Sequence, residues 1–350
     1  MALNIADLCT TLQESLLPIA GGNAPVSRSK TGFLDSLFSP INRQGFKAVP
    51  LRDQGRERQV RIQYLQQPST SSVLSGPIGT VRPNLCSNVV APTELTGKTV
   101  TVTQEAFIPF SMDENMFRDF CTWNMDEHRM WMMNVMIAPL LQRIDQLLLT
   151  KWVATMFGAY YDQGAPASKN FQLLNNGGES ANYAAFVDLI TEYMKIRGVG
   201  GKPIIVGDGN MSKFMQLMML GCCNADGIDL SQAKGDAYFF YDIDASSVAN
   251  GLGAANRFIA YSPGSLQFIQ YLANEGQFMQ MKEDYERRII VDPVSGMTLD
   301  FEMKYVECDR EFKFSLGTAF DLYGLPDDMY LGTGGMENVN GSLLGVATSA

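Results

Sequence analysis

The sequence feature that most constrains the fold is the apolar run over residues 111–159. It opens with Ser111-Met-Asp-Glu114, a capping box whose serine and glutamate can satisfy free backbone donors at a helix start. Five apolar residues then recur at helical spacing: Ile137, Leu141, Ile144, Leu148 and Trp152. A helix over the whole run would be roughly 70 Å long. We therefore expect it to span the molecule instead of lying inside one compact domain.

Pro139 interrupts this run, because proline removes a backbone donor and clashes with the turn before it. We expect either a kink at Pro139 or two helices, the second of which has Pro139 in its first turn. Both alternatives leave a long helix as the largest element of the chain.

The bulk composition indicates a folded protein with an uneven charge. A chain of 350 residues can bury a sizeable core and form one large domain or two smaller ones. The net charge of −10 argues against a dedicated nucleic-acid-binding protein. Residues 1–66 sum to +3 and the remainder to −13. A basic arm on an acidic body suits the attachment of one subunit to another.

The inventory of reactive side chains predicts no catalytic, cofactor or metal site. The single histidine, His128, lies among charged residues of the long helix, which is typical of a solvated surface and leaves a Ser-His-Asp triad without its base. The six cysteines are dispersed, so they predict reduced thiols of a cytosolic protein and form no zinc pattern. No run approaches the 18 apolar residues of a membrane span.

The first 50 residues are expected to form an extended arm. A short amphipathic helix over residues 4–17 precedes a segment rich in Gly, Pro, Ser and Asn. The apolar island GFLDSLF, residues 32–38, is expected to anchor this arm, and its Phe33 and Phe38 are candidate contacts to another subunit. An arm of this kind costs conformational entropy to order, so we expect it to lie along something larger than its own domain.

Two strands are predicted to form a long projecting hairpin. Residues 56–66 and 96–108 both alternate polar and β-branched or apolar positions, and about 30 loop residues separate them. A loop of that length is usually functional or interaction-bearing. Four arginines gather at its base and are either a solvated strand face or contacts to an acidic neighbouring subunit: Arg52, Arg56, Arg58 and Arg61.

The rest of the chain alternates helices and strands. Helices are predicted over residues 181–197, 211–220 and 265–274. Strands are predicted over residues 203–206, 238–243, 257–261 and 311–323, with a hairpin that pairs 287–291 with 297–308. Residues 324–350 are rich in Gly, Ser and Asn and are expected to be a tail.

Two further sequence patterns resemble ligand sites. Gly198–Asn210 could hold a phosphate on a helix start, but it matches neither dinucleotide nor P-loop spacing, and a tight strand-to-helix turn explains it as well. Four aspartates do not fit the regular Ca²⁺ loop: Asp226, Asp229, Asp242 and Asp244.

The order of these elements resembles the major capsid protein of tailed bacteriophages, which has the α+β HK97-type fold. The resemblance covers most of the chain and rests on architecture, without a diagnostic motif. It implies an N-terminal arm (1–50), an extended loop (51–110), a spine helix with a peripheral domain (111–198) and an axial domain (199–285). A hairpin and strand returning to the peripheral domain (286–324) and a tail (325–350) complete the implied division.

The resemblance also implies function and partners. It predicts a non-enzymatic protein of the virion, assembled in the host cytoplasm into hexamers and pentamers of a shell around double-stranded DNA. Portal, scaffolding and decoration proteins would be its other partners, and contact with the packaged DNA would be weak and non-specific. Two alternatives remain: an encapsulin-like cargo shell, and a phosphate-binding enzyme built on Gly198–Asn210.

Overall fold

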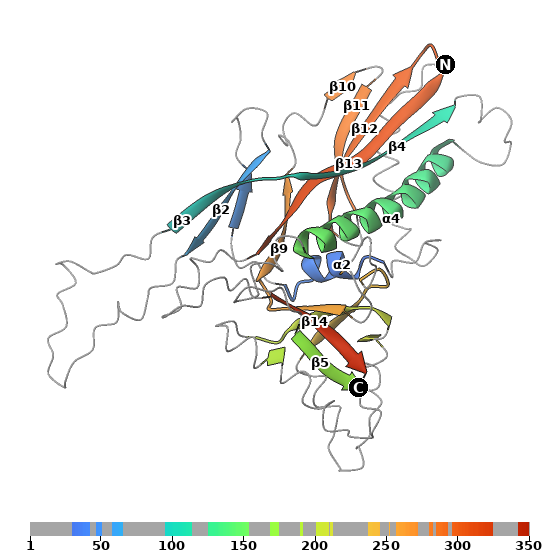
Figure 1. Cartoon of the computed structure of the whole chain (residues 1–350). Helices are drawn as coiled ribbons and strands as arrows, with labels where there is room; N and C mark the ends of the chain where they lie inside the picture. Colours follow the sequence, from blue (N-terminus) through green and yellow to red (C-terminus); the bar gives the residue numbers. More distant parts are fainter. Residues whose placement is uncertain are drawn as a thin grey trace, which may run out of the picture.

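The computed structural model describes residues 30–42, 47–50, 58–65, 95–113, 125–153, 169–174, 190–191, 201–209, 211–212, 237–245, 252, 257–271, 280–282, 285–292, 296–324 and 342–349. Strands within these residues form three sheets, and helix α4 (Met125–Lys151) crosses beside the largest of them (Figure 1). Helix α2 (Gly32–Phe38) lies between α4 and the sheet that contains β14 (Ser342–Ser349).

The largest sheet is antiparallel and has its long strand β13 (Glu311–Gly324) near the centre. Strand β13 pairs along one side with β4 (Gln104–Asp113). Its other side pairs first with β12 (Thr298–Val306) and then with β9 (Leu266–Tyr271). The sheet continues through β11 (Tyr285–Val291) to β10 (Gln280–Lys282). The predicted hairpin of residues 287–291 with 297–308 is confirmed, and alternate burial along β12 gives it one wet face.

The core lies between this sheet and α4. Ile137, Leu141, Ile144, Leu148 and Trp152 are all buried, which confirms the predicted apolar stripe. From the sheet, Phe110 and Phe314 contribute stacked rings 4.8 Å apart. Pro139 lies inside α4 on its exposed side, and the helix runs through it without dividing in two. Proline has no backbone N–H, but because Pro139 lies on the exposed side of α4, no buried carbonyl oxygen is left without a hydrogen-bond donor.

Two boundaries differ from the sequence prediction. The capping box does not begin a helix, because Ser111–Asp113 extend strand β4 opposite Glu311–Lys313 of β13. The helix predicted over residues 265–274 is wrong for Leu266–Tyr271, which form strand β9. The physical reason is that β13 continues past its pairing with β12, and β9 supplies backbone partners to that free edge. The buried Leu266 and Ile269 fit a helix by spacing, but their burial comes from this pairing.

A second sheet contains five strands in the order β5-β14-β8-β6-β7. Strands β6 (Ile204–Gly207), β7 (Tyr238–Tyr241) and β8 (Arg257–Tyr261) agree with the strands predicted there. Strand β5 (Lys169–Leu174) was not predicted. The expected tail is wrong for Ser342–Ser349, because this segment forms β14, parallel to β5 and antiparallel to β8.

The third sheet belongs to the projecting hairpin. Strands β2 (Gln59–Leu65) and β3 (Leu95–Thr101) pair antiparallel, as predicted, and β1 (Lys47–Pro50) adds a third strand to β2. The strand predicted over residues 96–108 is two strands, because β3 ends at Thr101 and β4 begins at Gln104 in the largest sheet. The hairpin and the body therefore share one stretch of chain, visible as the long line from β3 to β4 in Figure 1.

Several predictions lie outside the described residues. These are the helix over 4–17, most of the helices over 181–197 and 211–220, and the loop residues 66–94. Within the described residues, no helix combines the length and apolar character needed to cross a membrane.

Candidate functional site at the base of the hairpin

The hairpin leaves the body at Val102–Thr103, between β3 and β4. The Val102 backbone N–H donates to the Arg58 carbonyl at 2.8 Å, which closes the hairpin at its base. A small apolar cluster then joins the hairpin to β9 and β13: Val60, Ile62, Val100, Val102, Ile269 and Ala319. Because these residues come from both parts, the hairpin is packed onto the body at this point.

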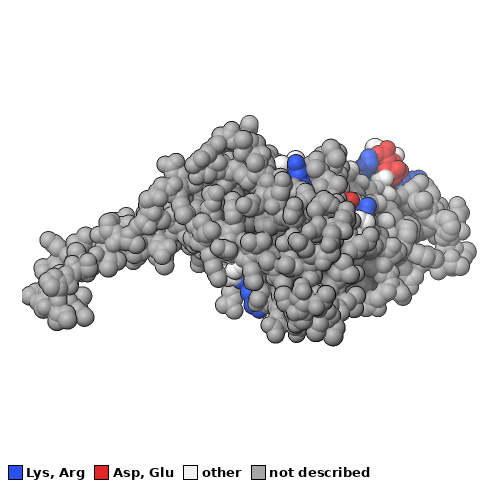
Figure 2. Space-filling model, turned by 60° about the horizontal axis from the view of Figure 1, so that its bottom comes forward, with Lys and Arg blue, Asp and Glu red and all other residues white. Residues whose placement is uncertain are grey.

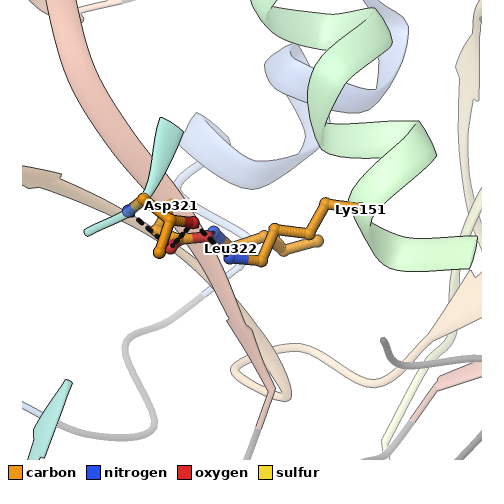
Figure 3. A network of polar contacts seen from close by, with 4 residues as sticks. Lys151, Asp321 and Leu322 are labelled. Carbon is orange, nitrogen blue, oxygen red and sulfur yellow. Dashed lines mark hydrogen bonds and ion pairs between the residues drawn. The ribbon is translucent and has the colours of Figure 1, made fainter. Parts of the chain in front are cut away.

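A buried polar network fixes the same point from inside (Figure 3). Asp321 of β13 is 1% exposed and forms an ion pair with Lys151, the last residue of α4. Its carboxylate also accepts from the Thr103 backbone N–H at 3.1 Å and from the Thr103 hydroxyl at 3.0 Å. The Leu322 backbone N–H adds a further donor at 2.8 Å. We call Lys151, Asp321 and Thr103 the clamp, since it ties helix, sheet and hairpin base together.

The clamp was not identified from the sequence. Asp321 stands between Phe320 and Leu322, within a half of β13 that is buried on both faces. An acidic residue in such a strand needs a buried partner, because an unpaired charge there is costly. An aspartate between two apolar residues of a buried strand is therefore the sequence signal that could have indicated the clamp. The partner, Lys151, is 170 residues away in the sequence.

Outside the clamp, an exposed ion pair bridges the hairpin and the body. Arg58 donates to Glu105 at 2.9 Å, and a second nitrogen–oxygen pair lies at 2.8 Å. The side chains are 39% and 51% exposed, respectively. Exposed pairs of this kind contribute about 0 to 1 kcal/mol, so this one adds orientation more than stability.

A hollow opens beside this pair on the wet face of the largest sheet. Arg58, Glu105 and Phe107 line it together with Arg287 and Asp300, which form a second ion pair. Phe107 is 64% exposed, and its Cβ lies so close to Gly317 that a Cβ there would be 2.6 Å away. Glycine is required at this close approach. An exposed aromatic ring within a charged rim is typical of a protein contact surface.

The predicted contact residues fall in different environments. Arg58 and Arg61 are described, and Arg52 and Arg56 lie outside the described residues. Arg61 is exposed on β2, opposite Thr99 of β3 and Val49 of β1. Phe38 is half-buried against Phe268, with ring centroids 5.0 Å apart. Phe33 is fully buried, so its ring packs inside its own chain and presents no surface to a neighbour.

The charged surface is mixed in sign. Figure 2 shows acidic and basic side chains side by side in one patch, without a large region of one sign among the described residues of that face. Lys313 and Asp309, an exposed pair at 3.0 Å, illustrate this pattern.

The described residues of the two patterns that resemble ligand sites have structural roles. Asp208, in the turn after β6, accepts from the Met211 backbone N–H at 3.1 Å and so caps the helix start that a phosphate would need. Asp244 accepts from Gln142 at 2.8 Å, and Asp242 is buried. Asp226 and Asp229 lie outside the described residues. No three potential ligands among the described His, Cys, Asp and Glu gather into a metal cluster.

Comparisons with known proteins give information on the fold alone. The sequence matches no protein-family model and no curated protein. In contrast, the structure superposes on the Cyanophage A-1(L) capsid asymmetric unit with a TM-score of 0.52 and 13% identity, over 91% of this chain and 92% of that chain. Bacteriophage PhiM1 mature capsid gives a TM-score of 0.46 at 11% identity, covering 86% of this chain and 85% of that one. Mycobacterium phage Adephagia gives 0.47 at 10% identity, covering 93% and 98%.

The first of these similarities spans nearly the full length of both chains, so it is not confined to a shared motif. It agrees with the resemblance carried by the order of elements in the sequence. The chain therefore shares its α+β fold with this cyanophage capsid chain.

Proposed function

We propose that this chain is a major capsid protein that assembles with copies of itself into the shell of a virion. The observation that carries the proposal is the fold similarity to a phage capsid subunit over 91% of this chain and 92% of that one. A similarity over whole chains favours a shared structural role more than a similarity over one domain does.

The finer division of the fold is part of the proposal. The β2–β3 hairpin would be the extended loop and α4 the spine helix. The sheet around β13 would belong to the peripheral domain, and the sheet of β6, β7 and β8 to the axial domain. The sheets support a modified boundary, since β4 belongs with β13 from Gln104 and β5 joins the second sheet.

The basic hairpin base would contact an acidic surface of a neighbouring copy through Arg52, Arg56, Arg58 and Arg61. The support is the charge of +3 on residues 1–66 against −13 on the remainder. Arg58 already pairs with Glu105 of its own chain, so a neighbour would share or replace that carboxylate. Hexamers and pentamers would be the assembly units, because closed shells repeat one interface by symmetry. Portal, scaffolding and decoration proteins and weakly contacted DNA would complete the partners.

Electron microscopy of the purified full-length chain, combined with light scattering, tests the proposal. We expect closed shells, or sheets and tubes built from six-fold units. The double variant Arg58→Glu, Arg61→Glu should lower the yield of such particles while the chain stays folded, because interface charges set rate and register. Lys313→Glu is the control, since Lys313 is an exposed lysine of the β12–β13 hairpin end paired only locally with Asp309.

A chain that stays monomeric at high concentration, and also when expressed with the other structural proteins of its genome, would contradict the proposal. Unchanged particle yield from the arginine variant at both low and physiological salt would contradict only the contact residues.

A further inference from the structure

Three elements meet at a pair of buried carboxyl groups. Asp145 lies in the last third of α4 and Asp242 directly follows β7, and both side chains are fully buried. Helix α2 places its first backbone donors between them. The Leu34 N–H donates to Asp145 Oδ1 at 2.7 Å, and the Phe33 N–H donates to Asp242 Oδ2 at 3.3 Å. The two carboxyl groups therefore hold one end of α2 from both sides.

Two negative charges on this buried pair would be unfavourable, so Asp145 and Asp242 are not both ionised. Oδ2 of Asp145 is buried and has no hydrogen-bond donor in the described part of the chain. Its interacting neighbour is Asp242, another carboxyl group, and two ionised carboxylates have no donor to offer each other. One proton shared between them supplies the missing hydrogen bond and removes one buried charge. Burial, and then the charge of Asp242, raise the pKa of Asp145 well above its usual range. Burial also raises the pKa of Asp242.

Two further aspartates add negative charge near the pair. Asp35 of α2 faces Asp145, and Asp244 faces Asp242. In the described part of the chain, no Lys or Arg forms an ion pair with either member of the pair. Strand β6 carries no titratable side chain, and Tyr271 of β9 packs in the hairpin cluster instead. From β8, Tyr261 donates its hydroxyl to Ser36 of α2 at 2.7 Å, and burial raises its pKa, so it stays neutral.

The position of α2 gives this pair a structural consequence. Helix α2 contacts α4 on one side and β6, β7 and β9 on the other. It is thus the piece that joins the layer of α4 to the second sheet, as Figure 1 shows. Gly32 brings α2 so close to β7 that a Cβ there would be 2.2 Å from the Tyr241 carbonyl oxygen. A change at the carboxyl pair cannot be absorbed by a shift of α2 toward β7.

We propose that Asp145 and Asp242 form a proton-operated latch, which holds α2 in place while one proton is shared and releases it when that proton is lost. The latch is a property of the single chain and does not rest on shell assembly. It would make the docking of the segment that follows residues 1–30 depend on pH.

The sign of the effect follows from proton linkage. When α2 leaves, water reaches both carboxyl groups and their pKa values return to the ordinary range near 4. Between that range and the raised pKa of the pair, the latched state holds one more proton than the released state. Rising pH therefore favours release, by about tenfold in the equilibrium per pH unit. Above the raised pKa the equilibrium no longer changes with pH, because both states are then fully ionised.

Hydrogen exchange of the unassembled full-length chain tests the latch. The protection of the Phe33–Phe38 amides, corrected for intrinsic exchange rates, should fall about tenfold per pH unit in the wild type as the pH rises from the ordinary carboxyl pKa to the raised pKa of the pair, and should then level off. The Asp145→Asn variant keeps an oxygen for Leu34 and gains an NH₂ that can donate to Asp242, so it mimics the protonated pair. Its protection should be flat with pH.

Asp244→Asn is the matched control, because it removes a nearby negative charge and leaves the shared proton in place. It should keep the tenfold slope. The proposal is overturned if the wild type shows no slope, or if Asp145→Asn keeps it. It is also overturned if the β13 amides lose protection in parallel with α2, which would mean global unfolding. If Asp145→Asn fails to fold, Asp242→Asn serves in its place, since it can donate to Asp145 Oδ2 in the same way.

Discussion

Helix α4 takes part in two buried polar contacts that differ in charge. At its last residue, Lys151 meets Asp321, and the two opposite charges cancel within a network that Thr103 and Leu322 complete. Inside the helix, Asp145 meets Asp242, and one shared proton would keep these two carboxyl groups from carrying two like charges. Asp321 and Asp145 are both almost completely buried, so the two contacts differ in the partner of each carboxyl group and not in its burial.

This difference assigns different behaviour to the parts that the contacts hold. The clamp fixes the base of the β2–β3 hairpin by an ion pair of opposite charges. The latch fixes α2 by a contact that solution pH can weaken. The comparison therefore predicts that mutations at Lys151 and at Asp145 of α4 separate these two properties.

The largest expected effect is that of Lys151→Met at the clamp. Met keeps most of the apolar length of lysine but leaves the Asp321 charge buried without its cation. Breaking a buried pair in this way costs about 3 kcal/mol or more, and urea unfolding of the full chain would measure it. The second substitution Asp321→Asn should recover part of the loss, because it removes the buried charge and keeps an oxygen for Thr103.

Lys313→Met is the control for the clamp, since its partner Asp309 is as exposed as Lys313 itself. It should leave the unfolding curve unchanged. A loss from Lys151→Met no greater than that of the control would mean that the clamp does not fix the hairpin base. The pH dependence of α2 protection should persist in Lys151→Met, because the latch is a separate contact.

A smaller effect is expected from Gly32→Ala, which acts on the latch by steric means. The new Cβ would lie 2.2 Å from the Tyr241 carbonyl oxygen and 2.8 Å from the Asp242 Cβ. Backbone atoms cannot yield as a side chain can, so we expect a loss of about 2 kcal/mol. Protection of α2 should then be low at pH 5 as well as at pH 9.

Gly209→Ala is the control for this substitution, because its Cβ would approach only the Tyr241 hydroxyl, at 3.9 Å. It should be neutral or slightly stabilising, as alanine favours a helix start over glycine. Wild-type protection of α2 in Gly32→Ala would show that the helix is not seated against β7 as described.

The sequence predicted the parts of the fold that local patterns determine. The β11–β12 hairpin has strict alternation around a turn sequence, and β2 and β8 also show strand patterns of their own. Strands β9 and β14 were missed because their state depends on free edges of β13, β5 and β8, which lie far away in the sequence. No local pattern encodes such pairing.

The buried acids could have been suspected from their positions, but their partners could not. Asp145 lies within the apolar stripe, four residues after Leu141 and three before Leu148. A carboxyl group on that face must be buried, and it must then be paired or protonated. The sequence cannot distinguish between pairing and protonation, because the partner Asp242 follows strand β7 and lies far from Asp145 in the sequence.

The smallest expected effect is that of Tyr261→Phe, which separates the neutral tether of α2 from the charged one. The Tyr261 hydroxyl donates to Ser36, which in turn donates to the Phe33 carbonyl oxygen at 2.6 Å. Phenylalanine keeps the edge contact between ring 261 and Phe33 and removes one hydrogen bond, at a cost of about 1 kcal/mol. Because the Tyr261 hydroxyl that is removed does not titrate near neutral pH, α2 protection should fall by a similar factor at every pH and keep its tenfold slope.

Tyr271→Phe is the control, since Tyr271 forms no hydrogen bond through its hydroxyl within the described residues. A loss of slope in Tyr261→Phe would assign the pH response to the tyrosine network and remove it from the carboxyl pair.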